Sequence, residues 1–141
     1  MKITKISDMK TIKKGWGRAS DGIAEVFVYH AGQETPETTI HIETVKLLHM
    51  AKGKRLSRHF HMDKSEYFIC VAGAFRIELW DSDARDLSDP PARTFTLREG
   101  ERMFVPATLQ HRMSGLNQKN TLLEVSTKDA DEDSYRIEKG D

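Results

Sequence analysis

Residues 53–73 read GKRLSRHFHMDKSEYFICVAG, and this stretch decides both the fold and the site. Its pattern is G-x5-H-x-H-x4-E-x6-G, in which the polar positions are His59, His61 and Glu66. Because side chains alternate along a strand, we expect His59 and His61 on one face, with their Cα atoms roughly 6.6 Å apart. The short polar turn that follows would fold the chain back and bring Glu66 beside the two imidazoles.

A second block occupies residues 100–115, which read GERMFVPATLQHRMSG. Its spacing, G-x5-P-x4-H, places His111 in a later strand, where it can supply a third imidazole. An HxH pair alone is usually just polar surface, and it is the two blocks together that favour a metal site. Three imidazoles and one carboxylate suit a divalent ion such as Zn, Mn, Fe, Ni, Co or Cu, with two octahedral positions left for water or substrate. The predicted ligands are His59, His61, Glu66 and His111.

The rest of the chain has a dominant period of two, which is typical of strands. We expect strands at residues 25–30, 38–50, 67–71, 75–80, 93–97, 102–105, 110–114 and 121–126. Residues 72–74 are expected to form a hairpin turn, and residues 81–93 a long hairpin loop. No segment carries a long 3.6-residue stripe. The pattern therefore predicts an all-β sandwich or small barrel with little helix.

Composition limits the class of protein. A chain of 141 residues fits a single domain, taken as residues 1–141. Basic and acidic residues number 22 each, which argues against nucleic acid or an anionic membrane as the main partner. The longest uncharged apolar stretch, residues 67–74, is too short to span a bilayer, and we expect no secretory signal. The single cysteine, Cys70, excludes a disulfide within the chain and is expected in the core. A cytoplasmic location follows as the expectation.

The two blocks resemble the two signature blocks of the cupin superfamily. The resemblance implies a double-stranded β-helix, a jelly-roll barrel, with a metal ion in one mouth and the four predicted ligands around it. Two positions depart from the family pattern: Thr108 stands where the second block usually has Gly, and Gly115 stands where it usually has Asn. Both positions shape turns and do not bind metal, so the ligand set is kept.

Most of the chain from Lys14 onward resembles type II phosphomannose isomerases more closely. Residues 54–66 are similar to that family's G-x-x-x-S-x-x-x-H-x-x-R-x-E stretch, with Lys64 in place of the Arg and His59 in place of a Gln. Further similar elements are KGWG at 14–17, LEVST at 123–127 and EDSYRIE at 132–138. The resemblance implies a metal-dependent isomerase or epimerase acting on a sugar or sugar phosphate.

Aldose–ketose isomerisation needs a Lewis acid and an acid/base group that moves a proton between neighbouring carbons. The candidates for that second role are Lys64, Glu124, Arg136 and, if they face the barrel interior and not solvent, His41 and Glu43. Arg136 suits a substrate anion, because its guanidinium matches phosphate geometry; the alternative is a salt bridge to acidic residues 131–133. Ser57 shares the face of the first two histidines and is either a hydrogen-bond donor to them or a plain polar residue. The acidic stretch 128–141 is expected to be solvated.

Two other function classes stay open. The same ligands could hold Fe(II) in an oxygenase or lyase that acts on a small acid or thiol. The protein could also be a non-catalytic cupin that binds a sugar or a metal without transforming it. A jelly roll leaves exposed strand edges, so a homodimer is expected in each case.

Overall fold

The computed structural model describes residues 10–14, 17–23, 44–127 and 130–141. Within these residues the chain forms eleven strands and one short 3-10 helix at Asp131–Asp133. The strands are β1 (Lys10–Lys14), β2 (Gly17–Ile23), β3 (Thr44–Ala51), β4 (Arg58–Phe60), β5 (Glu66–Ala72), β6 (Ala74–Trp80), β7 (Arg93–Arg98), β8 (Arg102–Val105), β9 (Gln110–Gly115), β10 (Lys119–Ser126) and β11 (Tyr135–Glu138). A search of the same residues finds no helix with the length and apolar character needed to cross a membrane.

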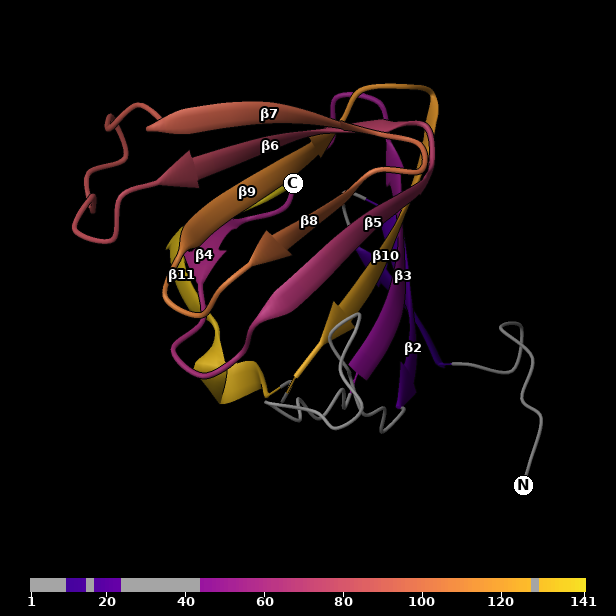
Figure 1. Ribbon diagram of the computed structural model, residues 1–141, viewed down its shortest axis with the longest axis horizontal. Coiled ribbons are helices and arrows are strands. Elements are labelled where there is room, and N and C mark those ends of the chain that lie inside the picture. The colour runs from indigo at the N-terminus through magenta and orange to yellow at the C-terminus, as the bar shows by residue number, and fades with distance from the viewer. Residues whose placement is uncertain (1–9, 15–16, 24–43, 128–129) are drawn as a thin grey trace, which may run out of the picture.

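The strands form two antiparallel sheets that face each other (Figure 1). The larger sheet has the order β1-β2-β3-β10-β5-β8, and the smaller one has the order β11-β4-β9-β6-β7. From β3 onward the chain passes repeatedly from one sheet to the other, which is the jelly-roll arrangement. The predicted all-β jelly roll with little helix is confirmed.

Alternation located most of the strands correctly. The six predicted segments from 67–71 to 121–126 match β5 to β10 within two residues at each end. β6 and β7 pair with each other around the intervening loop, which confirms the long hairpin loop. Residues 25–30, the first part of the predicted 38–50 strand (with His41 and Glu43) and the tryptophan of the KGWG element lie outside the described residues.

The hairpin predicted at residues 72–74 is wrong. β5 pairs with β10 and β8, whereas β6 pairs with β9 and β7, so the two strands belong to different sheets. Gly73 turns the chain from one sheet to the other with φ of 75°, and a Cβ there would collide with the carbonyl oxygen of Lys119. A glycine with positive φ is typical both of a tight hairpin and of a turn that carries the chain from one sheet to the other. The local sequence therefore does not distinguish the two kinds of turn.

The two sheets enclose an apolar core. Its buried side chains are Leu48, Met50, Phe68, Cys70, Phe75, Ile77, Leu79, Leu97, Val105, Met113 and Leu122. Cys70 is 1% exposed, as expected of a core residue. At the end of the barrel where β5 begins, the inward positions turn polar: Glu66 pairs in register with Ser126, and Glu124 with Lys46. This polar end of the interior holds the candidate site.

Candidate metal centre

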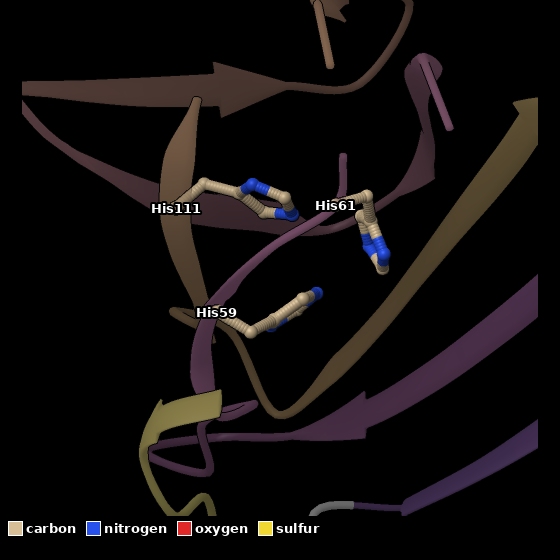
Figure 2. A group of neighbouring side chains, drawn as sticks. All are labelled: His59, His61 and His111. Carbon is tan, nitrogen blue, oxygen red and sulfur yellow. The ribbon is translucent and has the colours of Figure 1, made fainter. Parts of the chain in front are cut away.

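Three histidines converge in the polar end of the barrel. His59 lies on β4, His61 follows that strand directly, and His111 lies on β9, opposite His59 in register. One ring nitrogen from each lies within 4.8 Å of the other two (Figure 2). The ring centroid of His59 is 4.5 Å from that of His111 and 4.9 Å from that of His61. The alternation argument for a shared face is confirmed, and we call these three residues the histidine cluster.

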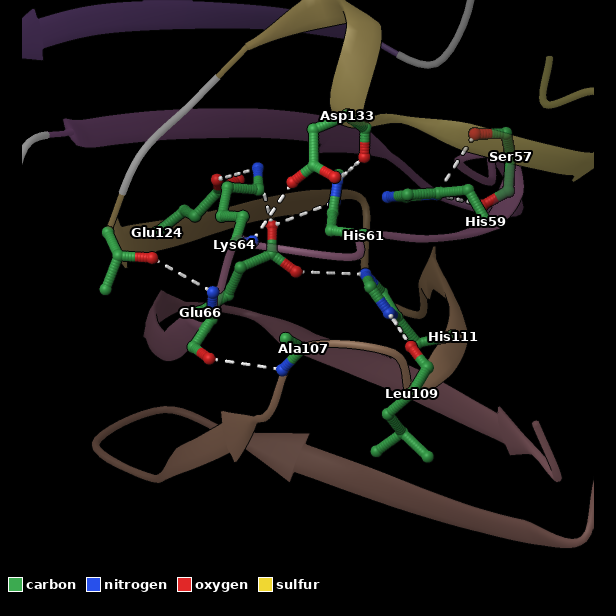
Figure 3. A network of polar contacts seen from close by, with 12 residues as sticks. Ser57, His59, His61, Lys64, Glu66, Ala107, Leu109, His111, Glu124 and Asp133 are labelled. Carbon is green, nitrogen blue, oxygen red and sulfur yellow. Dashed lines mark hydrogen bonds and ion pairs between the residues drawn. The ribbon is translucent and has the colours of Figure 1, made fainter.

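Backbone carbonyl groups orient all three imidazoles through their Nδ1 atoms (Figure 3). The Nδ1-to-oxygen distance is 2.9 Å in each of the pairs His59–Ser57, His61–Asp133 and His111–Leu109. Because a carbonyl oxygen can only accept, each Nδ1 donates its proton and leaves the Nε2 lone pair available. Histidines that bind metals are commonly fixed in this way through their second nitrogen.

The carboxylate of Glu66 lies against two of the three histidines. Its Oε2 is 3.1 Å from Nε2 of His111, and its Oε1 is 3.5 Å from Nε2 of His61. Burial acts to raise the pKa of Glu66, but the contacts with His111 and His61 and the charge of Lys64 outweigh it. The pKa therefore lies well below its ordinary value, and the carboxylate is charged. Among the described residues, the possible ligand atoms that all lie within 4.8 Å of one another belong to the three histidines. Glu66 is not part of this set, although its carboxylate contacts two of the histidines.

The buried atoms of this site fit a metal ion. In the described part of the chain, four buried side-chain polar atoms make no hydrogen bond, and three of them are His61 Nε2, Glu66 Oε2 and His111 Nε2. Leaving a buried polar atom without a hydrogen bond costs about 1–3 kcal/mol, so folded proteins contain few of them. A cation held by imidazole nitrogens and a carboxylate would satisfy all three. The histidine cluster is therefore able to bind a metal.

The imidazoles differ in their attraction for protons. Burial, followed by the nearby charge of His111, lowers the pKa of His59 to about 3, so this ring is neutral at pH 7. Burial also acts to lower the pKa of His111, but the contact with Glu66 outweighs it, and the pKa is raised. The raised pKa means that the Glu66 carboxylate favours a proton on Nε2 of His111, where it also favours a metal cation. Metal binding must displace that proton.

Two of the three predicted acid/base residues, Lys64 and Glu124, contact each other next to Glu66. Lys64 Nζ is 2.8 Å from Glu66 Oε1 and 3.1 Å from Glu124 Oε1, and the three side chains are buried. Burial raises the pKa of Glu124, and the charge of Glu66 raises it further against the opposing charges of Lys64 and Lys46. A buried carboxyl that favours its protonated form is suited to general acid catalysis.

The third predicted residue, Arg136, lies elsewhere. It is opposite His59 in the pairing of β4 with β11, and it lines a pocket together with Ser57 and His59. Within the described residues it makes no ion pair with the acidic residues 131–133. Ser57 itself contacts Nδ1 of His59 through both its carbonyl oxygen and its hydroxyl, at 2.9 and 3.1 Å.

Most described residues of the acidic stretch are exposed, but Asp133 is buried, which corrects the expectation of a solvated tail at this position. β11 adds to the edge of the smaller sheet, and Asp133 is 8% exposed. The Asp133 carboxylate accepts hydrogen bonds from the backbone N–H groups of residues 62–64, and its carbonyl accepts from His61. Burial acts to raise the pKa of Asp133, but these backbone hydrogen bonds outweigh it, and the pKa is lowered. No sequence signal identifies this residue, because 72 positions separate it from His61.

A second group missed by sequence reasoning lies on the opposite face of β4 and β9. Arg58 is fully buried, and its Nε and Nη2 donate to Gln110 Oε1 at 3.2 and 3.1 Å. Its guanidinium also donates to two carbonyl groups of the loop that follows β6 and lies 4.4 Å from the ring centroid of Trp80. β4 and β9 share a single register pair, so this contact adds a second link between the strands that carry His59 and His111.

Comparison with solved structures supports the fold. Oxalate decarboxylase from Bacillus subtilis matches with a TM-score of 0.70 and 15% identity over 95% of this chain and 32% of that chain. The capsular polysaccharide assembling protein CapF of Staphylococcus aureus matches with a TM-score of 0.66 and 18% identity over 92% and 32% of the two chains. Mn(II) centres are described for the oxalate decarboxylase.

At these identities the likeness shows the fold alone, and that is the cupin fold. The present chain spans about a third of the length of either structure. No protein-family model matches the chain, and a search of curated proteins finds no match.

Proposed function

We propose that this metal-binding cupin is an isomerase or epimerase that acts on a sugar or sugar phosphate. The observation that carries the proposal is a cluster of three oriented imidazoles and a carboxylate with orphaned buried atoms, next to the buried Lys64–Glu124 pair. His59, His61, His111 and Glu66 would hold one divalent ion, such as Zn, Mn, Fe, Ni or Co. When bound, the ion supplies Lewis acidity toward the carbonyl and hydroxyl oxygens of the substrate.

Three further residues would supply the acid/base group, its positioning and the binding of the substrate. Glu124 is the candidate acid/base, because burial and the charge of Glu66 raise the pKa of its carboxyl group. Lys64 bridges Glu66 and Glu124, so it fixes the distance between the metal-binding carboxylate and the acid/base group. Arg136, on the other side of His59, is placed to bind an anionic part of the substrate.

The test is turnover of a panel of hexose, pentose and heptose phosphates by tag-free protein supplied with Zn, Mn, Co or Ni. We expect Glu124→Gln to lower kcat by about 100-fold or more, the usual scale for a lost acid/base group, while the protein keeps its metal. Glu99→Gln, an exposed residue on the loop before β8, is the matched control and should leave kcat unchanged. Absence of isomerised product from every sugar with metal bound would contradict the proposal.

A second candidate is a metal-dependent oxygenase or lyase that acts on a small acid or thiol. It is supported by the same three-histidine, one-glutamate set and by the likeness in fold to a decarboxylase described with Mn(II) centres. Oxygen uptake or CO2 release by Fe(II)- or Mn(II)-loaded protein with small acids would favour it over the isomerase. Saturable sugar binding without any product would favour a non-catalytic cupin.

The partners belong to the same proposal. We propose a small-molecule substrate and a homodimer that forms through the exposed sheet edges, in a cytoplasmic setting. Light scattering of the purified chain tests the dimer: a mass near twice 16.1 kDa supports it, and a mass near 16.1 kDa contradicts it.

A further inference from the structure

A pocket of about 290 Å³ opens beside one member of the histidine cluster. Its lining includes Ser57 and His59 from the β4 segment and Arg136, Lys139 and Asp141 from the β11 segment. His59 is the only residue of the histidine cluster in this lining. A molecule in the pocket can therefore approach the candidate metal position from the side of His59.

The strand register places an arginine next to that histidine. β11 pairs antiparallel with β4, and Arg136 is directly opposite His59. Residues that are directly opposite in an antiparallel pair project from the same face, with Cβ atoms about 4.5–5.5 Å apart. The side chain of Arg136 therefore begins on the same face as the metal-binding imidazole and extends along the pocket wall.

The charges around the pocket do not cancel. Glu138 is already engaged by Arg112 at 2.7 Å and by Arg55 at 3.7 Å. Asp141 lines the pocket, but its carboxylate accepts from the backbone of Arg55 at 3.0 Å and lies 3.9 Å from that guanidinium.

The two cations of the lining are Arg136 and Lys139. In the part of the chain that the structure describes, no ion pair is found for Arg136 or for Lys139. Both residues are exposed, and both line the pocket.

We propose that Arg136 and Lys139 form a phosphate-binding subsite that anchors one end of the substrate while its reacting end reaches the metal past His59. Two neighbouring cations suit the charge of a phosphate monoester, and the planar guanidinium fork matches the geometry of its oxygens. The idea that the bound substrate reaches the metal rests on the proposed function. Phosphate binding by Arg136 and Lys139 does not, so the subsite and the proposed reaction can be disproved separately.

The probe is inorganic phosphate, titrated calorimetrically into the full-length chain at low ionic strength, before and after chelation of any bound metal. We expect saturable binding that Arg136→Gln and Lys139→Gln each weaken by about fivefold or more and that the double variant abolishes. Arg98→Gln, an exposed arginine on β7, is the matched control and should change the affinity by less than about twofold. Thermal unfolding verifies the fold of each variant, and if Arg136→Gln fails to fold, the exposed Lys139→Gln decides.

Three results would overturn the subsite. Arg98→Gln could weaken phosphate binding as much as the pocket variants do, which would indicate unspecific attraction. Binding could disappear on chelation but survive the double variant, which would place the phosphate on the metal. Acetate could bind as tightly as phosphate, which would make this a carboxylate site. Phosphate binding that follows the prediction, in a protein without isomerase activity, would retain the subsite and reject the proposed reaction alone.

Discussion

The two faces of β4 and β9 make opposite use of buried polar side chains. On the outer face, the buried Arg58 and Gln110 satisfy each other and the carbonyl groups of the loop after β6. On the inner face, one residue further along each strand, His59 and His111 belong to the histidine cluster. In the described part of the chain, Nε2 of His61, Nε2 of His111 and the neighbouring Oε2 of Glu66 make no hydrogen bond. A satisfied buried group stabilises the fold, whereas an orphaned group costs free energy unless a ligand binds it. Within two neighbouring strands, buried polar side chains that stabilise the fold therefore lie on one face, and those that fit a ligand lie on the other.

The largest expected effect comes from the inner face. His111→Ala removes a proposed ligand, and we expect the affinity for a divalent ion to fall by more than the roughly 10–100-fold typical of a lost outer partner. The metal-free protein should also lose some stability, because His111 is buried, donates to the Leu109 carbonyl and contacts the Glu66 carboxylate. Competition titrations with a chromophoric chelator and unfolding in the presence of chelator give the two quantities. A large loss of stability at unchanged metal affinity would reverse the assignment of the faces.

The outer face should respond in the opposite way. Arg58→Met leaves Gln110 Oε1 and the Asp86 carbonyl without their buried donor, and we expect a loss of about 3 kcal/mol in the free energy of unfolding. Metal affinity should fall less than in His111→Ala, because all ligands are still present. Urea unfolding measures the first effect, with Arg85→Met, an exposed arginine on the same loop, as the control. Equal free energies of unfolding for Arg58→Met and the control would show that the hydrogen bonds of Arg58 do not stabilise the fold.

Asp133 supports the segment that carries His61, and its contribution to stability depends on pH. Asp133→Asn weakens three backbone hydrogen bonds to a charged acceptor, so we expect a loss of about 2 kcal/mol at pH 7. The pKa of Asp133 in the folded protein is lowered from its ordinary 3.8. Its stabilisation is therefore present above that ordinary value and disappears as the pH falls through the folded-state pKa. In unfolding curves measured from pH 7 downward, the difference between the two proteins should be constant above pH 3.8 and should narrow as the pH falls below that value. A difference that stays constant down to the acid end would contradict this role.

The smallest expected effect is a gain in stability. Thr108 adopts φ of 73°, a left-handed conformation that is unfavourable for a β-branched residue, and its backbone N–H donates to the carbonyl of His61 at 2.6 Å. Thr108→Gly should relieve the strain and stabilise the fold by about 1 kcal/mol, without a change in metal affinity. The midpoint of thermal unfolding checks this. A lower midpoint would show that the threonine side chain contributes more than its backbone costs.

The sequence predicts the inner face far better than the outer one. His59, His61, Glu66 and His111 were found because alternation and block spacing are local properties that survive folding. Thr108 was likewise singled out as a departure at a turn, and the structure places it in the conformation that glycine prefers. These four residues are predicted as metal ligands, and the geometry of the histidine cluster supports that proposal.

What sequence reasoning missed depends on contacts between distant segments. Arg58 looks like any polar residue on a strand, and only the loop that closes over it makes it a buried group. Asp133 is one of several acids in a charged stretch until β11 pairs with β4. The assignment of β5 and β6 to different sheets depends on partners that each strand finds elsewhere in the chain. None of these pairings leaves a local pattern.

The central claim is that the inner face is a metal site, and metal analysis by mass spectrometry of tag-free protein tests it most directly. The variant is His59→Ala/His61→Ala, and the control is His49→Ala, whose imidazole contacts Thr121 and does not belong to the cluster. We predict close to one divalent ion per chain in the wild type and in the control, and none in the double variant. Wild-type protein that holds no metal even after reconstitution, or a double variant that holds as much as the wild type, would contradict the claim.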